Sequence, residues 1–195
     1  VTRGSNVQVP GATYVLTGVN EQLENVAELK VSGIDFDARY NMRLPSTWGE
    51  LNMNLLATYY DEATQNTAGT ALNLLGQAGG STSDQGWVDW TANGNIGWRW
   101  NNWNANWNLR YIGRADMGPT TTQAGYPQIG SHTYHNVKVS YSFEGGEVFG
   151  GITNLTDKQP PFFASGSAGT QALDTVPAYY DVYGRSFFVG ARYKF

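Results

Sequence analysis

The chain has 195 residues, enough for one domain or two small ones, and its formal net charge of −4 gives no reason to expect a nucleic-acid partner. The absence of cysteine excludes disulfide frameworks and thiolate sites, and two histidines are too few for a histidine-rich metal centre. Only 14% of the residues are charged, against about 25% in ordinary soluble domains. No apolar run reaches the roughly 20 residues of a membrane helix, which excludes a helical membrane protein.

The first 26 residues do not follow a strand pattern. The stretch Val7–Val19 is interrupted by Pro10, Gly11 and Gly18, and such residues are typical of loops. We therefore interpret residues 1–26 as a loop and incoming segment ahead of the first strand.

Seven segments from residue 27 onward alternate between apolar and polar residues, the pattern of strands whose successive side chains point to opposite faces. They cover about 27–44, 49–60, 86–100, 103–115, 131–143, 147–155 and 184–195. In the fourth segment, Trp103, Trp107 and Leu109 alternate with asparagines. The alternation changes phase at Gly33, which predicts a β-bulge.

The strongest strands have about eleven or more residues, against a usual five to six in globular sheets. Eleven residues rising about 3.3 Å each at a tilt near 45° span roughly 26 Å, the height of the apolar band of an outer-membrane barrel. Short connections at 45–48, 101–102 and 144–146 alternate with long ones at 61–85, 116–130 and 156–183. The sequence predicts an all-β, antiparallel transmembrane β-barrel segment with short periplasmic turns and long extracellular loops.

The two faces of the strands indicate different surroundings. The polar face is mostly Asn, Ser, Thr and Gly with scattered Arg and Asp, which is typical of a wet, enclosed lumen. Tryptophan and tyrosine lie toward the ends of the apolar stripes, where the aromatic girdles of a membrane barrel are found. We expect the apolar face to contact outer-membrane lipid.

Seven strands are too few to close a barrel, because bacterial single-chain barrels have an even number and at least eight. An open sheet would leave two unpaired edges in lipid. We therefore expect residues 1–26 to be an extracellular loop and incoming segment. Residues 27–195 would then be the carboxyl-terminal strands of a larger barrel whose plug and earlier strands are absent.

Three segments carry a family resemblance. Residues 25–35 end in Ser32-Gly33-Ile34-Asp35 and resemble the strand-opening segment of TonB-dependent outer-membrane receptors. Residues 153–161 resemble the Asn-Leu-Phe-Asp-Lys-x-Pro-Pro motif of that family, with Thr156 in place of its Phe. Residues 180–190 resemble the Tyr-Asp-x-x-Gly-Arg segment that leads into the last strand. The order and spacing of the three also match the family.

This resemblance implies a 22-stranded barrel around a plug in the outer membrane of a Gram-negative bacterium. Such a receptor imports a scarce nutrient (an iron chelate, cobalamin or an oligosaccharide) with energy from TonB, which acts through a plug that this chain lacks. Gly190, Tyr193 and Phe195 resemble the signal that the barrel-assembly machinery reads. The resemblance implies no enzymatic activity and no cofactor.

The polar face supplies the candidate contact residues. Its bases outnumber its acids, so we expect an acidic plug surface or an anionic ligand to oppose it. The candidate ligand contacts at the lumen or mouth are Arg110, Arg114, Asp89, Tyr134 and Asn136. The candidate plug contacts are Arg43, Arg99, Asp35 and Asp37. Most of the charges are expected to form cross-strand pairs, because charges inside a membrane usually face an interior and pair there.

Three alternatives fit parts of the pattern: a segment of a passive porin, an outer-membrane enzyme, and a soluble, aromatic-rich, glycan-binding β-sandwich. The porin shares the alternation but not the three motifs. An enzyme would need a cleft of facing carboxylates and histidines. His132 and His135 point to opposite faces of a strand, so we expect no shared metal site, and no catalytic residue is identified.

Overall fold

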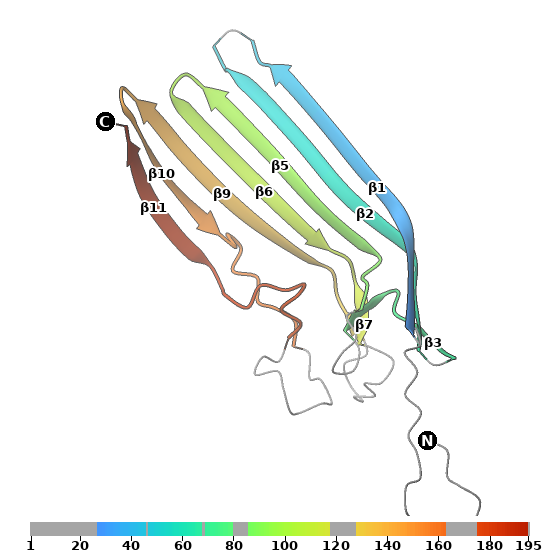
Figure 1. The fold of residues 1–195 in the computed structure, drawn as a ribbon. Coiled ribbons are helices and arrows are strands. Elements are labelled where there is room, and N and C mark those ends of the chain that lie inside the picture. Colours follow the sequence, from blue (N-terminus) through green and yellow to red (C-terminus); the bar gives the residue numbers. More distant parts are fainter. Residues whose placement is uncertain are drawn as a thin grey trace, which may run out of the picture.

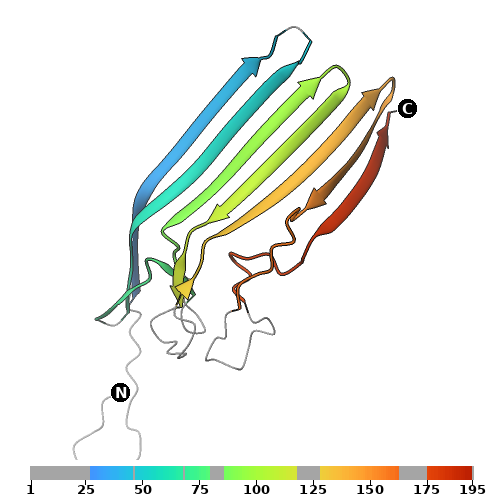
Figure 2. The same cartoon turned by 180° about the vertical axis from the view of Figure 1, so that it is seen from behind.

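The computed structural model describes residues 27–45, 47–67, 69–79, 86–117, 128–162 and 175–194. Seven long antiparallel strands form one curved sheet in the order β1-β2-β5-β6-β9-β10-β11 (Figures 1 and 2). They are β1 (Ala27–Arg43), β2 (Glu50–Thr67), β5 (Trp90–Trp100), β6 (Trp103–Ile112), β9 (His132–Phe143), β10 (Gly146–Thr153) and β11 (Ser186–Tyr193). Over the described residues β1 and β11 are not paired with each other, so the sheet is an open segment of a barrel wall.

Four short strands lie at the end of the sheet that carries the long connections (Figure 1). The strand β3 (Thr70–Asn73) pairs with the end of β2. The strands β4 (Gln77–Gly79), β7 (Ala115–Met117) and β8 (Gln128–Ile129) form a separate small sheet. We call this end of the molecule the mouth and the opposite end the turn end.

The seven predicted strands are all present, but one boundary differs by more than a few residues. β2 continues to Thr67, whereas the alternation predicts an end near residue 60. Residues 61–67 are polar apart from Ala63 and are held by pairing with the start of β1. Because both faces of this extension carry polar side chains, the sequence has no alternation there that would reveal it.

The predicted bulge at Gly33 is confirmed. Ser32 pairs with Glu62 and Gly33 pairs with Tyr60, which leaves Asp61 as the extra residue of β2. A Cβ atom on Gly33 would clash with the backbone carbonyl of Tyr59, so this close approach of two strands requires glycine.

The three short connections are also confirmed, and all lie at the turn end (Figure 1). Asn101 adopts a φ of +48° in the two-residue turn between β5 and β6. Between β1 and β2, the Leu44 N–H donates to the Gly49 carbonyl at 2.8 Å, and Gly49 has a φ of +82°. Such positive φ values are typical of tight turns.

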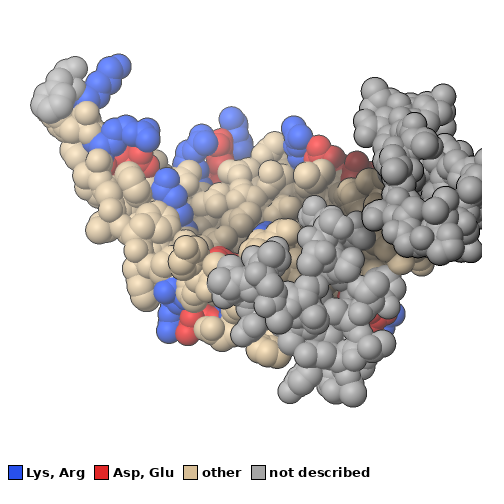
Figure 3. Space-filling model, turned by 60° about the horizontal axis from the view of Figure 1, so that its bottom comes forward, with Lys and Arg blue, Asp and Glu red and all other residues tan. Residues whose placement is uncertain are grey.

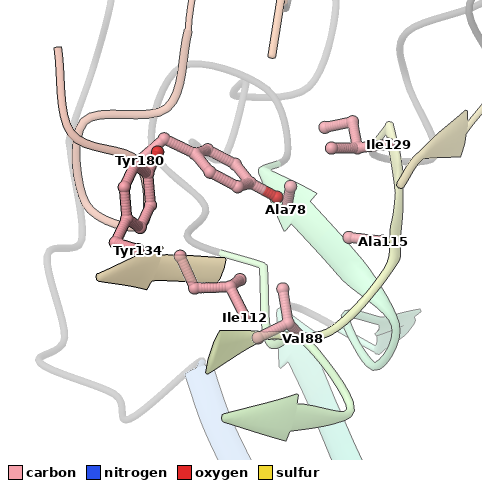
Figure 4. Packing of buried hydrophobic residues seen from close by; sticks show 7 residues of the cluster. All are labelled: Ala78, Val88, Ile112, Ala115, Ile129, Tyr134 and Tyr180. Carbon is pink, nitrogen blue, oxygen red and sulfur yellow. The ribbon is translucent and has the colours of Figure 1, made fainter. Parts of the chain in front are cut away.

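No second layer packs on the long strands in the described part of the chain. The main cluster of buried apolar residues lies instead at the mouth: Ala78, Val88, Ile112, Ala115, Ile129, Tyr134 and Tyr180 (Figure 4). The long strands thus form a single layer, which contradicts a β-sandwich, in which two sheets would bury their facing sides. Among the described residues, no helix is long and apolar enough to cross a membrane.

Candidate functional site

The strand register sorts the side chains into two faces, because directly paired residues point to the same side of a sheet. One cross-strand row contains four asparagines: Asn54, Asn95, Asn108 and Asn136. The Asn136 amide donates to the Asn108 side-chain oxygen at 3.3 Å, and the Asn154 N–H donates to the Asn136 side-chain oxygen at 2.9 Å. This polar side, which we call the inner face, therefore carries a continuous wall of amide groups.

The opposite, outer face carries two bands of aromatic rings. Near the mouth, Trp90 packs against Tyr59 in a tilted arrangement with ring centroids 4.7 Å apart. Near the turn end, Trp103 lies 4.8 Å from Tyr141, and Trp98 lies 5.9 Å from Trp100. Trp90 and Trp100 are the ends of the 11-residue strand β5. The ten steps between them span about 33 Å along the strand and about 25 Å at a tilt of about 40°. This separation matches the girdles of a membrane-spanning barrel.

The predicted plug contacts all lie on the inner face, where Figure 3 shows many of the charged side chains gathered along the upper outline. Glu50 is shared by Arg43 at 3.3 Å and Arg99 at 3.8 Å. Asp37 pairs with Arg39 at 2.9 Å, and Asp35 accepts from the Thr58 hydroxyl at 2.7 Å. The three ion pairs are exposed in this open sheet, so each contributes little to stability.

A segment of the last long connection covers the inner face at the mouth. This segment, residues 175–183, is called the mouth strap. The Tyr179 hydroxyl donates to the Gly86 carbonyl at 2.6 Å, and the Asp181 N–H donates to the Tyr134 hydroxyl at 3.2 Å. These bonds join the strap to β9 and to the residues that precede β5.

Tyr180 is the apolar anchor of the mouth strap. Only 2% of it is exposed, and Figure 4 shows its ring pointing toward Ala78 while the Tyr134 ring rises from β9 beneath the strap. His132 packs edge-on against Tyr180 with ring centroids 5.0 Å apart. Burial raises the pKa of Tyr180 to about 12 and also raises the pKa of Tyr179, so both hydroxyls are protonated at neutral pH.

The strap and the wall enclose a hollow at the mouth. The guanidinium carbon of Arg110 lies 4.8 Å from the centroid of the Tyr134 ring, a cation–π geometry. The described residues that line this mouth hollow are Arg110, Tyr134, Asn136, Pro177, Tyr180, Asp181, Val182 and Tyr183. It thus offers a guanidinium, a carboxylate and exposed aromatic surface within one concavity.

Comparison with known families gives one match. A family model described as TonB dependent receptor-like, β-barrel matches residues 2–155, most of the chain. The chain belongs to this family. Searches of curated proteins and of solved structures found no match.

Family membership agrees with the arrangement of the strands. A TonB-dependent receptor barrel is an outer-membrane receptor of Gram-negative bacteria and not an enzyme. Membership of this family implies that the partners are outer-membrane lipid, a plug, TonB and a nutrient. The match favours the receptor over the porin, enzyme and soluble alternatives. Residues 25–35, which carry one of the three sequence resemblances, lie within the matched range.

The receptor's predicted ligand contacts divide into two groups. Arg110, Tyr134 and Asn136 line the mouth hollow together. Arg114 is exposed between β6 and β7, and the Asp89 carboxylate lies beside Gly76, so neither is among the residues that line the hollow. Asp89 precedes β5 and Arg114 follows β6. Outside the strands the alternation no longer determines which face a side chain is on, so the sequence could not place these two residues.

Two further inner-face features were not predicted. Glu147 pairs with Arg192 and with Ser142 in the register, which puts an additional acid on the inner face. The mouth strap has no periodic signal; its sequence markers are the Tyr179-Tyr180 pair and the start of the motif at residues 180–190, and neither predicts its contacts. The strap is recognised only once the fold brings residues 175–183 next to β9.

The two histidines occupy opposite faces, as predicted. His132 pairs with Ile112 in an inner row and its Nδ1 lies 2.8 Å from the Gly130 carbonyl. His135 pairs with Leu109 in an outer row and accepts from the Trp107 indole at 3.3 Å. Over the described residues, no group of three potential metal-ligating side chains is found.

The residues of the predicted assembly signal lie on the last strand. Gly190 pairs with Phe149, and Tyr193 pairs with Gly146. Phe195 lies outside the described residues.

Proposed function

We propose that this chain forms part of the wall of a receptor that imports a scarce nutrient, an iron chelate, cobalamin or an oligosaccharide, and that the nutrient contacts the mouth hollow. Arg110, Tyr134 and Asn136 are the wall side of this contact, and the mouth strap is its other side. The imported molecule then moves past the inner face when TonB acts on the plug.

The proposal rests mainly on the surroundings of the Arg110 guanidinium. Its guanidinium stacks on Tyr134, and no salt bridge to it is found among the described residues. A guanidinium has five N–H donors in a planar fork that suits carboxylate or phosphate oxygens. Arg43 and Arg99 share Glu50, whereas Arg110 keeps its donors available to an anionic group of the nutrient.

The test is uptake by the full-length receptor in whole cells. Replacing Arg110 by Gln should lower uptake of the transported nutrient at limiting concentration, while plug retention stays unchanged. Arg43→Gln and Arg99→Gln are matched controls at the turn end, and we expect them to weaken plug retention more than uptake. Iron chelates, cobalamin and oligosaccharides are supplied in separate assays, so that the same experiment identifies the substrate class. Unchanged uptake of all three by the Arg110 variant contradicts a ligand role for this residue.

A further inference from the structure

Two phenylalanine rings lie on the polar inner face, in the half of the wall nearer the turn end. Phe188 of β11 pairs with Gly151, which in turn pairs with Lys138 of β9. Phe149 of β10 pairs with Gly190 on one side and Ser140 on the other. Because paired residues share a face, both rings belong to the same side as Lys138 and Ser140. We call Phe149, Phe188 and Lys138 the inner aromatic patch.

Each ring is seated on a glycine of the neighbouring strand. A Cβ atom on Gly151 would overlap the ring of Phe188, and a Cβ atom on Gly190 would overlap the ring of Phe149. The two ring centroids are 6.5 Å apart, and the Lys138 ammonium lies 4.7 Å from the Phe149 centroid. The rings therefore lie across the paired strands β10 and β11, and a cation borders them.

The patch is unlike its surroundings. In the same cross-strand rows the inner face carries Asn41, Asn52, Asn106 and Ser140 on the other strands. Phe188 remains 41% exposed even though it is seated on a glycine. Apolar surface left in a water-filled lumen has a free-energy cost at all times, at about 25 cal/mol per Å². A solute in transit would cover it only briefly, whereas a resident protein surface covers it permanently.

The polar residues in the same cross-strand row as Phe149 support an extended partner. The row that contains Phe149 continues through Ser140 and Asn104 to Arg99, Glu50 and Arg43. Aromatic surface at one end and ion-paired side chains at the other thus lie along one cross-strand row of the inner face. Among the described residues, no salt bridge involves Lys138.

We propose that the inner aromatic patch is the docking site on this wall for the receptor's plug. The occupant is an apolar or aromatic side chain of the plug that packs on Phe149 and Phe188, with a carboxylate beside it for Lys138. The proposal depends on the family having a plug, and it does not depend on the ligand role of the mouth hollow.

Photocrosslinking in the full-length receptor in outer membranes tests this placement directly. Benzoylphenylalanine is introduced at position 188 and, as the matched control, at position 187, whose side chain is on the outer face. We expect position 188 to crosslink to a peptide of the plug of the same receptor, and position 187 to give no such peptide. Adducts of position 188 with lipid or solute alone, no adduct, or equal plug crosslinking from both positions each overturn the proposal.

A second measurement compares two inner-face substitutions. Phe188→Ser should increase protease cleavage of the plug in intact membranes by about tenfold, because a partly exposed ring loses its apolar contact. Leu56→Ser replaces another exposed inner-face apolar residue, on β2, away from the patch, and should change cleavage by less than about threefold. Equal effects of the two variants overturn the docking site. Nutrient uptake by the Arg110 variant is a separate readout, so failure of either proposal is recognised independently.

Discussion

At the scale of single residues, Tyr180 combines apolar anchoring with a buried hydroxyl. The hydroxyl has no hydrogen-bond partner among the described residues, and burial is the main cause of its raised pKa. An unpaired buried hydroxyl lowers the stability of the closed strap, while the buried ring increases it. The strap is therefore held by packing together with the hydrogen bonds of Tyr179 and Tyr134.

The raised pKa predicts how the strap responds to alkaline pH. Ionisation is easier when Tyr180 is exposed, with a pKa near 10, than when it is buried, with a pKa of about 12. The stabilisation of the closed strap is therefore complete below about pH 10 and is lost as the pH rises to about 12. Amide hydrogen exchange of residues 175–183, corrected for the intrinsic rate, should increase over this range. Tyr180→Phe should reduce the increase without abolishing it, because the pKa of Tyr179 is also raised by burial and its hydroxyl also holds the strap. Persistence of the full effect in that variant would show that Tyr180 is not responsible.

Gly33 gives a second prediction at this scale. Gly33→Ala should destabilise the folded wall by about 1–3 kcal/mol, because the new methyl group meets the Tyr59 carbonyl in the bulge. Gly130→Ala is the control, since a Cβ atom there meets nothing within 4 Å. The measurement is unfolding of the receptor in lipid vesicles with denaturant. A Gly33 variant as stable as the Gly130 variant contradicts the requirement for glycine at the bulge.

At the scale of the strands, the sequence predicts those strand segments whose two faces have different surroundings. Leu109 and Trp107 alternate with Asn108, as expected of a strand with lipid on one side and the lumen on the other, and this pattern identifies the strand and its two faces. Beyond the membrane both sides meet water or protein. The extension of β2 through Thr64 to Thr67 therefore has no alternation, and the partners of the mouth strap depend on contacts between residues far apart in the chain.

The faces of β6 give the third prediction. Leu109→Arg puts a charge in the outer row of Leu55, Gly94 and Leu109 and should destabilise folding into lipid vesicles by about 2–4 kcal/mol. Asn108→Arg changes the neighbouring position on the inner face, where a guanidinium meets water and amides, and should have a much smaller effect. Equal losses of folding free energy in the two variants would refute the assignment of the faces.

At the scale of the whole molecule, the sheet has two long edges. β1 and β11 each pair on one side only within the described residues, so about every second N–H and C=O group along them has no partner in the sheet. Each such group costs several kcal/mol in hydrocarbon, which sums to the order of tens of kcal/mol over the two edges. The wall is therefore stable in a membrane only when other strands continue it.

This cost predicts how the 195-residue chain behaves by itself. Refolded into detergent micelles, the chain should form assemblies joined through β1 and β11 or remain unfolded, and it should run at one position on a denaturing gel with or without prior heating. The full-length receptor should instead migrate as a compact species until it is heated, because a closed barrel has no free edges and resists the detergent. Crosslinking between cysteines introduced at Val31 and at Val189 distinguishes edge-to-edge assembly from unfolding, since only the former brings β1 of one copy next to β11 of another. A compact, heat-sensitive monomer formed by the chain alone would show that the two edges are satisfied within one copy, and the open sheet would then not be the arrangement that exists in the membrane.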